Sequence, residues 1–526
     1  MHFDTHDQLL FVALLIGLAA LLIAAPVFRI PYPIFLVLGG LVLGFVPGVP
    51  ELQLPPDVVL VAVLPPLLYT SAFFTSLREL RSNAHAIGIL AVGLVVATTL
   101  TVALVAHEAI DGMSWAAAFA LGAIVAPTDP IAATAIMRRL GVPRRLVSIV
   151  ESESLVNDGT ALVLYRVAVV AAVTGEFSVW DASWRLVWSI FGGVAIGLVV
   201  GAVVAAVRRR LDNPPVEVTI ALMTGYLAFI PASAAEASGV LAVVTAGVYL
   251  GWRTPELTTV QTRLQGQAVW EIIAFVLNAL LFALVGLQLS GILDALAGIP
   301  NDDLVKYALI VTGTVIATRI LWLPFFTHLP YWLRGQPRVK PWSQSFLVSW
   351  AGMRGAVSLA AALAIPLTTD AGAAFPERDL IIFLTFCVIL GTLVLQGLTL
   401  PAVIRLFGIQ PDDSEEREDA EARIRAAEAA IARLEDLAGE DWVRGETAER
   451  MRGLYNFRQN RFSSRFDGES DGAIEEQSQA YQRLRRELLD AERAAIVQLG
   501  RAGEISGDVV NRVVRDLDLE DARLDV

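Results

Sequence analysis

The sequence has little charge and a single cysteine, Cys387, which excludes an intramolecular disulfide and argues against a metal-thiolate site. Charged residues make up only 18% of the 526 residues, whereas hydrophobic residues make up 55% and the mean hydropathy is +0.60. A soluble domain of this length rarely has such a composition. The sequence also lacks the GxxxxGK[ST] pattern of a phosphate-binding loop and the TVGYG pattern of a potassium-channel filter. These absences argue against a nucleotide-driven pump and against a channel of that kind.

Long apolar runs, by contrast, recur through the first four-fifths of the chain. A transmembrane helix needs about 20 predominantly apolar residues, so this pattern predicts an all-α polytopic membrane protein. We predict about thirteen transmembrane helices, at residues 8–27, 33–48, 57–76, 84–107, 114–137, 146–174, 184–207, 216–233, 238–252, 267–290, 304–326, 343–366 and 378–407.

The turns between these segments alternate in charge. One set of turns carries Arg29, Arg78, Arg81, Arg138, Arg139, Arg144, Arg145, Arg208, Arg209, Arg210, Arg253, Arg263, Arg334, Arg338 and Lys340. The other set carries Glu51, Asp57, Glu108, Asp111, Glu176, Asp181, Asp302, Asp303, Asp370, Glu377 and Asp379, and only Arg185, Lys306 and Arg378 break the pattern. Basic turns face the cytoplasm, so we expect the N-terminus outside the plasma membrane and the C-terminus inside.

Four carboxylates lie in one stretch of membrane-length sequence: Asp129, Glu151, Glu153 and Asp158. Ionisable residues inside a membrane are costly, and they usually face a protein interior or a water-filled path. Carboxylate, hydroxyl, amide and carbonyl oxygens suit hard monovalent cations, which points to a cation site here. Glu151 is expected at the cytoplasmic end of its segment rather than in the site. Arg319, in a later apolar segment, is interpreted as making helix-to-helix hydrogen bonds or snorkelling.

Two segments carry the signals of a broken helix. Pro127 and Pro130 flank Thr128-Asp129 in the fifth segment, and Gly352 and Gly355 flank Arg354 in the twelfth. The two segments are seven apart, so they cross the membrane in opposite directions. Interrupted segments at matching positions of inverted halves mark a transporter binding site, so we predict two inverted repeats, segments 1–6 and 8–13.

The composition changes abruptly near Gln410, where a charged linker leads into amphipathic helical patterns. We therefore predict two domains: a transmembrane domain at residues 1–409 and a soluble, helical, cytoplasmic tail at residues 410–526. A dimerising or solubilising role and a regulatory ligand site both remain open for the tail.

Three motifs together resemble the sodium/proton exchanger family, in particular the bacterial monovalent cation:proton antiporter-1 group. They are the Thr128-Asp129-Pro130 break, ESLVNDGTAL around Asn157-Asp158, and GMRGAVSLA around Arg354. The resemblance implies a thirteen-helix homodimer, in which segments 4–6 and 11–13 form the transporting core and the remaining segments a dimerisation scaffold. The expected partners are a monovalent cation, the proton, membrane lipid and a second copy of the chain. Neither a cofactor nor nucleic acid is expected.

The resemblance also implies roles for individual residues. Asp158 would bind cation and proton in turn, and Asp129, Thr128 and Ser154 would contribute to the same metal-ion site. Asn157 resembles the residue that electroneutral members of the family have at this position.

A buried ion pair between Glu153 and Arg354 is likewise implied. This sequence departs from the family pattern at Thr70, where some relatives carry an acidic residue. The resemblance therefore does not imply a further carboxylate ligand from that segment.

The sequence thus predicts a secondary antiporter, not an enzyme, that exchanges a monovalent cation for protons by alternating access. Sodium is the leading candidate, and potassium or lithium stays open. A cation channel is an alternative, because a channel could use the same carboxylates. An intramembrane aspartyl protease would need Asp129 and Asp158 as a catalytic pair, and it fits the Asn-Asp setting and the buried arginine less well.

Overall fold

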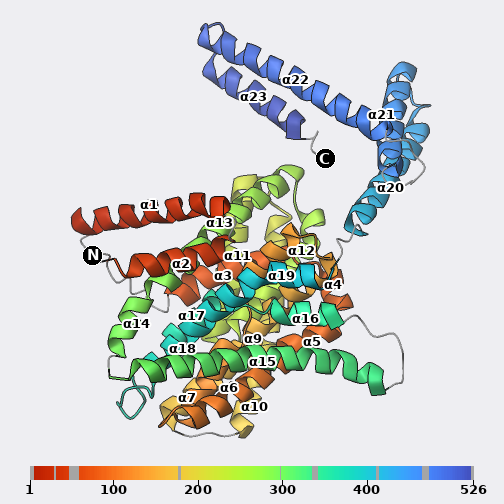
Figure 1. The fold of residues 1–526 in the computed structure, drawn as a ribbon. Helices are drawn as coiled ribbons and strands as arrows, with labels where there is room; N and C mark the ends of the chain where they lie inside the picture. Colours follow the sequence, from red (N-terminus) through yellow and green to blue (C-terminus); the bar gives the residue numbers. More distant parts are fainter. Residues whose placement is uncertain are drawn as a thin grey trace. The chain divides into compact units, whose positions relative to one another are not determined.

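The computed structural model describes residues 5–28, 31–46, 58–175, 179–296, 298–333, 342–409, 414–464 and 473–522 (Figure 1). Of the charged turn residues, Arg29, Glu51, Asp57, Glu176, Arg334, Arg338 and Lys340 lie outside these ranges, as does Gln410. By its contacts the chain divides into two units, the membrane unit, Met1–Pro411, and the tail unit, Asp412–Val526.

The membrane unit is built from helices. They are α1 (Thr5–Phe28), α2 (Tyr32–Gly44), α3 (Leu64–Phe74), α4 (Leu77–Ser82), α5 (Ala84–Gly88), α6 (Val95–Ala109), α7 (Trp115–Val125), α8 (Ile131–Arg139), α9 (Arg144–Thr174), α10 (Val179–Arg208), α11 (Pro214–Ala234), α12 (Gly239–Leu257), α13 (Val260–Leu287), α14 (Leu289–Ala295), α15 (Asn301–Leu333), α16 (Trp342–Trp350), α17 (Ala356–Leu363), α18 (Arg378–Gly391) and α19 (Gly397–Leu406). Three π-helical stretches, Val58–Val63, Ile89–Leu94 and Thr392–Gln396, join or precede helices of this series.

Each of the thirteen predicted segments coincides with one or more of these helices. Among the described residues, seven helices are long and apolar enough to cross a membrane: Ala84–Ala109, Arg144–Thr174, Val187–Arg208, Pro214–Ala234, Val260–Leu293, Asn301–Phe326 and Arg378–Leu406. Four of the other predicted segments fall on shorter apolar helices, Ile16–Ala25, Tyr32–Gly44, Val61–Phe74 and Trp115–Val125. The count of thirteen spans and the inverted repeat therefore stay predictions.

Both segments that carry the signals of a break are interrupted. The fifth predicted segment is split into α7 and α8 by a non-helical stretch that contains Pro127 and Pro130. The twelfth is split into α16 and α17 around Gly352 and Gly355. Proline has no backbone donor for a helical hydrogen bond, and the rings of two prolines close together prevent a regular turn between them.

The helices that carry the breaks pack against one another. α7 contacts α6, α9, α17 and α18, while α15 contacts α6, α16 and α18 (Figure 1). A second group consists of α3, α10, α11 and α12, and α2 packs mainly against α13. Most residues of the two non-helical stretches are buried, among them Thr128 in the first and Arg354 in the second.

The tail unit is also helical, with α20 (Ser414–Leu437), α21 (Gly445–Ser464), α22 (Ala473–Arg501) and α23 (Gly507–Ala522). α20 packs on α21, and α22 packs on α23 as a helical hairpin (Figure 1). Ion pairs such as Arg493 with Asp518, at 2.9 Å, bridge the hairpin.

Candidate functional site

The two helix breaks lie against each other and satisfy each other's free backbone groups. The backbone N–H of Asp129, in the first break, donates to the carbonyl oxygen of Met353 in the second, at 2.8 Å. In the opposite direction, Nε of Arg354 donates to the carbonyl oxygen of Val125 at 2.7 Å. A buried backbone group without a partner is costly, so these bonds make each break depend on the other.

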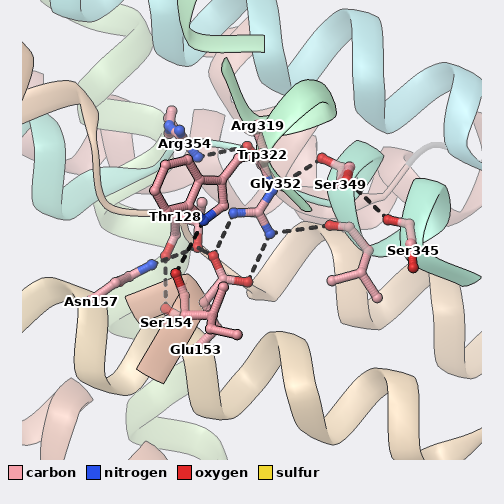
Figure 2. Close-up of polar contacts among 12 residues, drawn as sticks. Thr128, Glu153, Ser154, Asn157, Arg319, Trp322, Ser345, Ser349, Gly352 and Arg354 are labelled. Carbon is pink, nitrogen blue, oxygen red and sulfur yellow. Dashed lines mark hydrogen bonds and ion pairs between the residues drawn. The ribbon is translucent and has the colours of Figure 1, made fainter. Parts of the chain in front are cut away.

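Thr128 links the first break to the middle of α9 (Figure 2). Its carbonyl oxygen accepts a hydrogen bond from Oγ of Ser154 at 2.7 Å. Its own hydroxyl donates to the carboxylate of Glu153 at 3.3 Å and accepts from Nδ2 of Asn157 at 2.8 Å. All four side chains are buried. The structure therefore brings together four of the residues that the sequence singles out.

The same network orients the amide of Asn157. The Thr128 hydroxyl has one hydrogen, which it gives to Glu153, so it can only accept from Asn157. The amide nitrogen must then face Thr128. The amide oxygen, Oδ1, is left buried with no hydrogen-bond partner in the described part of the chain. This oxygen is available as a ligand to a cation.

Asp158 follows Asn157 on α9 and is 5% exposed. Among the residues that the structure describes, none donates a hydrogen bond to its carboxylate. Asp129 is close enough to act on it electrostatically. The Asp129 carboxylate, only partly buried, accepts at 2.9 Å from the backbone N–H of Ile131, the first residue of α8. A buried carboxylate without a donor is unfavourable unless a proton or a cation neutralises it.

The prediction that Glu153 pairs with Arg354 is wrong. Glu153 pairs instead with Arg319 of α15, whose Nη2 lies 2.7 Å from Oε2, while Nη1 contacts Oε1 (Figure 2). Both side chains are almost fully buried. Arg319 also donates from Nε to the carbonyl oxygen of Ser349 at 3.0 Å and from Nη2 to that of Val348 at 3.1 Å. Arg319 thus ties α9, α15 and the end of α16 together.

Arg354 has a different role. It lies in the second break, where Nε bonds Val125 and Nη1 bonds the carbonyl oxygen of Gly352 at 2.9 Å. Val125 ends α7, and a cation is favourable beside the free carbonyls of a helix C-terminus. The backbone N–H of Arg354 donates to Oγ1 of Thr392, at 3.0 Å, in a π-helical stretch. Its Nη2 is buried, and no described residue forms a hydrogen bond with it.

The glycines of the second break are needed for space. A Cβ at Gly352 would overlap the Arg319 guanidinium, and a Cβ at Gly355 would overlap the Asp129 carboxylate. The backbone of Gly355 is extended and accessible to any residue, so the constraint at that position is steric. Both glycines therefore let a charged side chain approach the break closely.

Two other residues lie apart from this network. Glu151 pairs with Arg138 at 2.7 Å on an exposed surface. Thr70 is buried and donates its hydroxyl to the carbonyl oxygen of Pro66 in its own helix, at 2.7 Å. Sequence reasoning missed Arg319 as the partner of Glu153, although an arginine within an apolar span is itself a signal for a buried anion.

The oxygen atoms near the breaks could hold a cation. The candidates are the carboxylates of Asp158 and Asp129, Oδ1 of Asn157, and the lone pairs that Ser154 and Thr128 keep after their hydrogen bonds. All are hard oxygen ligands, which suit alkali-metal cations. No group of three or more His, Cys, Asp or Glu side chains that could hold a metal occurs within the described ranges.

Known proteins resemble this chain over nearly its full length. The family model described as sodium/hydrogen exchanger, transmembrane, matches residues 10–406. An uncharacterised Na(+)/H(+) exchanger of Mycobacterium tuberculosis is 36% identical over 534 residues, covering 99% of this chain and 97% of the relative. The Na(+)/H(+) antiporter ApNhaP of Aphanothece halophytica is 31% identical, and the match covers 96% of this chain and 95% of that relative.

Other known proteins match a smaller share of the chain. The sodium, potassium, lithium and rubidium/H(+) antiporter of Bacillus subtilis is 32% identical, covering 71% of this chain and 57% of the relative. The solved structure of the sodium proton antiporter MjNhaP1 from Methanocaldococcus jannaschii shares the fold, with a TM-score of 0.59 and 19% identity, over 78% of this chain and 100% of that chain. The chain therefore belongs to the sodium/hydrogen exchanger family, and it is a multi-pass membrane transporter rather than an enzyme.

Proposed function

We propose that this protein exchanges a monovalent metal cation for protons across the plasma membrane, with both ions competing for the carboxylate of Asp158. The observation that carries the proposal is the setting of this side chain, which is buried beside a double helix break and lacks a hydrogen-bond donor among the described residues. A carboxylate in such a place needs a neutralising ligand. A proton and a hard cation are the two ligands that its oxygen atoms favour.

Competition at one carboxylate couples the two fluxes. Either ligand neutralises Asp158, and only a neutralised site crosses the apolar interior at low cost. The occupied site would then face the two sides of the membrane in turn, so neither ion moves without exchange for the other. This is alternating access, in which Asp129, Asn157, Ser154 and Thr128 complete the coordination.

The exchange is proposed to be electroneutral, one cation for each proton. Asn157 places an amide, rather than a second carboxylate, beside Asp158. A single exchanging carboxylate binds either one monovalent cation or one proton. Each exchange therefore moves one positive charge in each direction and no net charge across the membrane. We propose sodium as the main cation, because relatives are named Na(+)/H(+) antiporters, with potassium and lithium as further substrates, because one relative's name includes them.

We also propose a homodimer with the N-terminus outside the cell and residues 410–526 as a cytoplasmic tail. The alternation of basic and acidic turns supports this orientation.

The test is a proteoliposome assay with an imposed pH gradient, in which sodium, potassium and lithium are added in turn. Sodium addition should dissipate the gradient, and clamping the membrane potential at zero should leave the rate unchanged. Cation flux that ignores the pH gradient would instead indicate a channel. A rate that follows the membrane potential would contradict electroneutral exchange.

A further inference from the structure

Away from the helix breaks, a cavity of about 620 Å³ opens in the membrane unit. It lies where α3, α10 and α12 end and where α4, α11 and α13 begin. Its charged lining residues are Arg78, Arg81, Arg208 and Arg263, and its aromatic lining includes Trp252 and Trp270. These ends belong to turns of the basic set, so the cavity lies on the side that we assign to the cytoplasm.

The rim of this cavity carries uncompensated positive charge. Within the described ranges, no acidic residue lines the cavity. Arg78 and Arg81 are exposed and make no ion pair with any residue in the described part of the chain. Arg263 is also exposed, and it donates from Nη1 to the carbonyl oxygen of Thr258 at 2.7 Å rather than to a carboxylate. Three arginines at one opening repel one another unless an anion lies between them.

The fourth arginine, Arg208, is only 3% exposed, and its Nε and Nη1 have no hydrogen-bond partner among the residues that the structure describes. Glu217 is the neighbouring carboxylate, and its Oε2 lies 3.8 Å from Nε, beyond hydrogen-bonding distance. The other oxygen of Glu217 accepts from Oγ1 of Thr262 at 3.3 Å. Glu217 therefore offsets the charge of Arg208 in part but leaves Nε and Nη1 without a hydrogen bond to it. A buried guanidinium with unused donors in a cavity wall is suited to an anionic ligand.

We propose that this cavity binds an anion that bears a phosphate group. Guanidinium groups match phosphate oxygens in a bidentate geometry, and the cavity volume falls in the range of small-molecule sites. The phosphate would lie among Arg208 and the rim arginines, and an apolar portion of the ligand would contact Trp252 and Trp270. A phospholipid headgroup and a soluble phosphate compound share this chemistry. The site is separate from Asp158, so the proposal does not rest on antiport.

The test uses the purified full-length protein in an uncharged detergent and measures thermal unfolding. The probes are sodium pyrophosphate, dioctanoyl phosphatidic acid and, as a phospholipid of no net charge, dioctanoyl phosphatidylcholine. A ligand that binds only the folded state raises the unfolding temperature with concentration. We expect a saturable rise with at least one of the two anionic probes and none with phosphatidylcholine.

The decisive comparison is between two triple variants. Arg78→Gln, Arg81→Gln and Arg263→Gln together should weaken the apparent affinity about tenfold or more, because charge-assisted hydrogen bonds to the phosphate are lost. The matched control changes Arg139, Arg209 and Arg210 to Gln, all exposed and none lining the cavity. Arg208 is kept, since its removal would leave Glu217 as an uncompensated buried charge.

The outcomes separate the two sources of phosphate. A shift with phosphatidic acid alone assigns the site to a lipid headgroup, whereas a shift with pyrophosphate, with or without one from phosphatidic acid, assigns it to the phosphate group itself. The proposal is overturned if neither anion gives a saturable shift, or if the control variant loses affinity as much as the cavity variant does.

Discussion

Glu153 and Arg319 form the buried ion pair of the site, although they lie 166 positions apart in the sequence. Each partner makes further contacts, Glu153 with Thr128 and Arg319 with the end of α16. Removing one charge would leave the other unpaired in a low-dielectric interior, which typically costs about 3–5 kcal/mol, whereas removing both can be nearly neutral.

We therefore expect Glu153→Gln or Arg319→Met to destabilise the membrane unit more than the double change does, as measured by thermal unfolding in detergent. Arg354→Met is the matched comparison, because it removes a nearby arginine that does not pair with Glu153. The coupling energy of Glu153 with Arg319 should exceed its coupling with Arg354. Equal coupling with the two arginines, or losses that simply add for Glu153 and Arg319, would contradict the assigned pair.

Gly355 offers a second prediction at this scale. An alanine there would overlap the Asp129 carboxylate, and such overpacking typically costs about 1–3 kcal/mol. Gly355→Ala should lower both the unfolding temperature and the apparent cation affinity in the exchange assay. Gly313→Ala, in α15 where a Cβ meets open space, is the control and should leave both quantities unchanged or slightly raise stability. Normal cation affinity in Gly355→Ala would show that this glycine does not influence cation binding at the site.

At the scale of elements, the two broken segments also depend on a third segment, which contains the π-helical stretch Thr392–Gln396. The π-helical stretch Thr392–Gln396 places the Thr392 hydroxyl against the backbone N–H of Arg354. Thr392 also donates to the carbonyl oxygen of Val388 at 2.7 Å. The Thr392 hydroxyl thus connects the π-helical stretch to the second break, at Arg354.

Thr392→Val keeps the shape of the side chain and removes this acceptor, so the N–H of Arg354 would be left buried and unpaired. That should cost about 1–3 kcal/mol of unfolding free energy. Thr392→Ser restores the hydroxyl and should recover most of the loss. If valine and serine behave alike, the hydrogen bond contributes nothing to the break.

The break positions could be predicted from the sequence because they follow from local chemistry. Pro127 and Pro130 interrupt a helix wherever it packs, and Gly352 and Gly355 mark an irregular stretch. The partner of Glu153 could not be predicted in the same way. Which of two buried arginines reaches a carboxylate depends on how α9, α15 and α16 pack, and on where free carbonyls attract Arg354 instead. The motif resemblance indicated a buried pair for Glu153 but gave Arg354, rather than Arg319, as its second member.

At the scale of the whole molecule, the tail unit packs within itself, through contacts of α20 with α21 and α22 with α23. All residues of the proposed ion site belong to the membrane unit. We therefore expect a chain truncated after Pro411 to insert and to exchange cation for protons, with a changed pH profile or stability at most. Proteoliposome exchange of the truncated chain checks this. A truncated protein that is folded but inactive would make the tail part of the transport machinery.

The helical segments themselves were predictable, since each predicted apolar run coincides with helix in the structure. The number that cross the membrane was not, because several runs form helices too short to qualify by length and composition alone. Length decides whether one straight helix can span a bilayer. Whether a broken or tilted helix does so also depends on how it packs against its neighbours.

The central claim is that Asp158 carries the exchanged ions, and Asp158→Asn tests it most directly. The amide is nearly isosteric, so the protein should fold, but it can neither take up a proton nor neutralise a cation. Glu151→Gln, on the same helix but in an exposed ion pair, is the matched control. In proteoliposomes with an imposed pH gradient, we predict that Asp158→Asn abolishes sodium-dependent proton flux while Glu151→Gln retains it. Exchange at the unmodified rate by a folded Asp158→Asn protein would contradict the account.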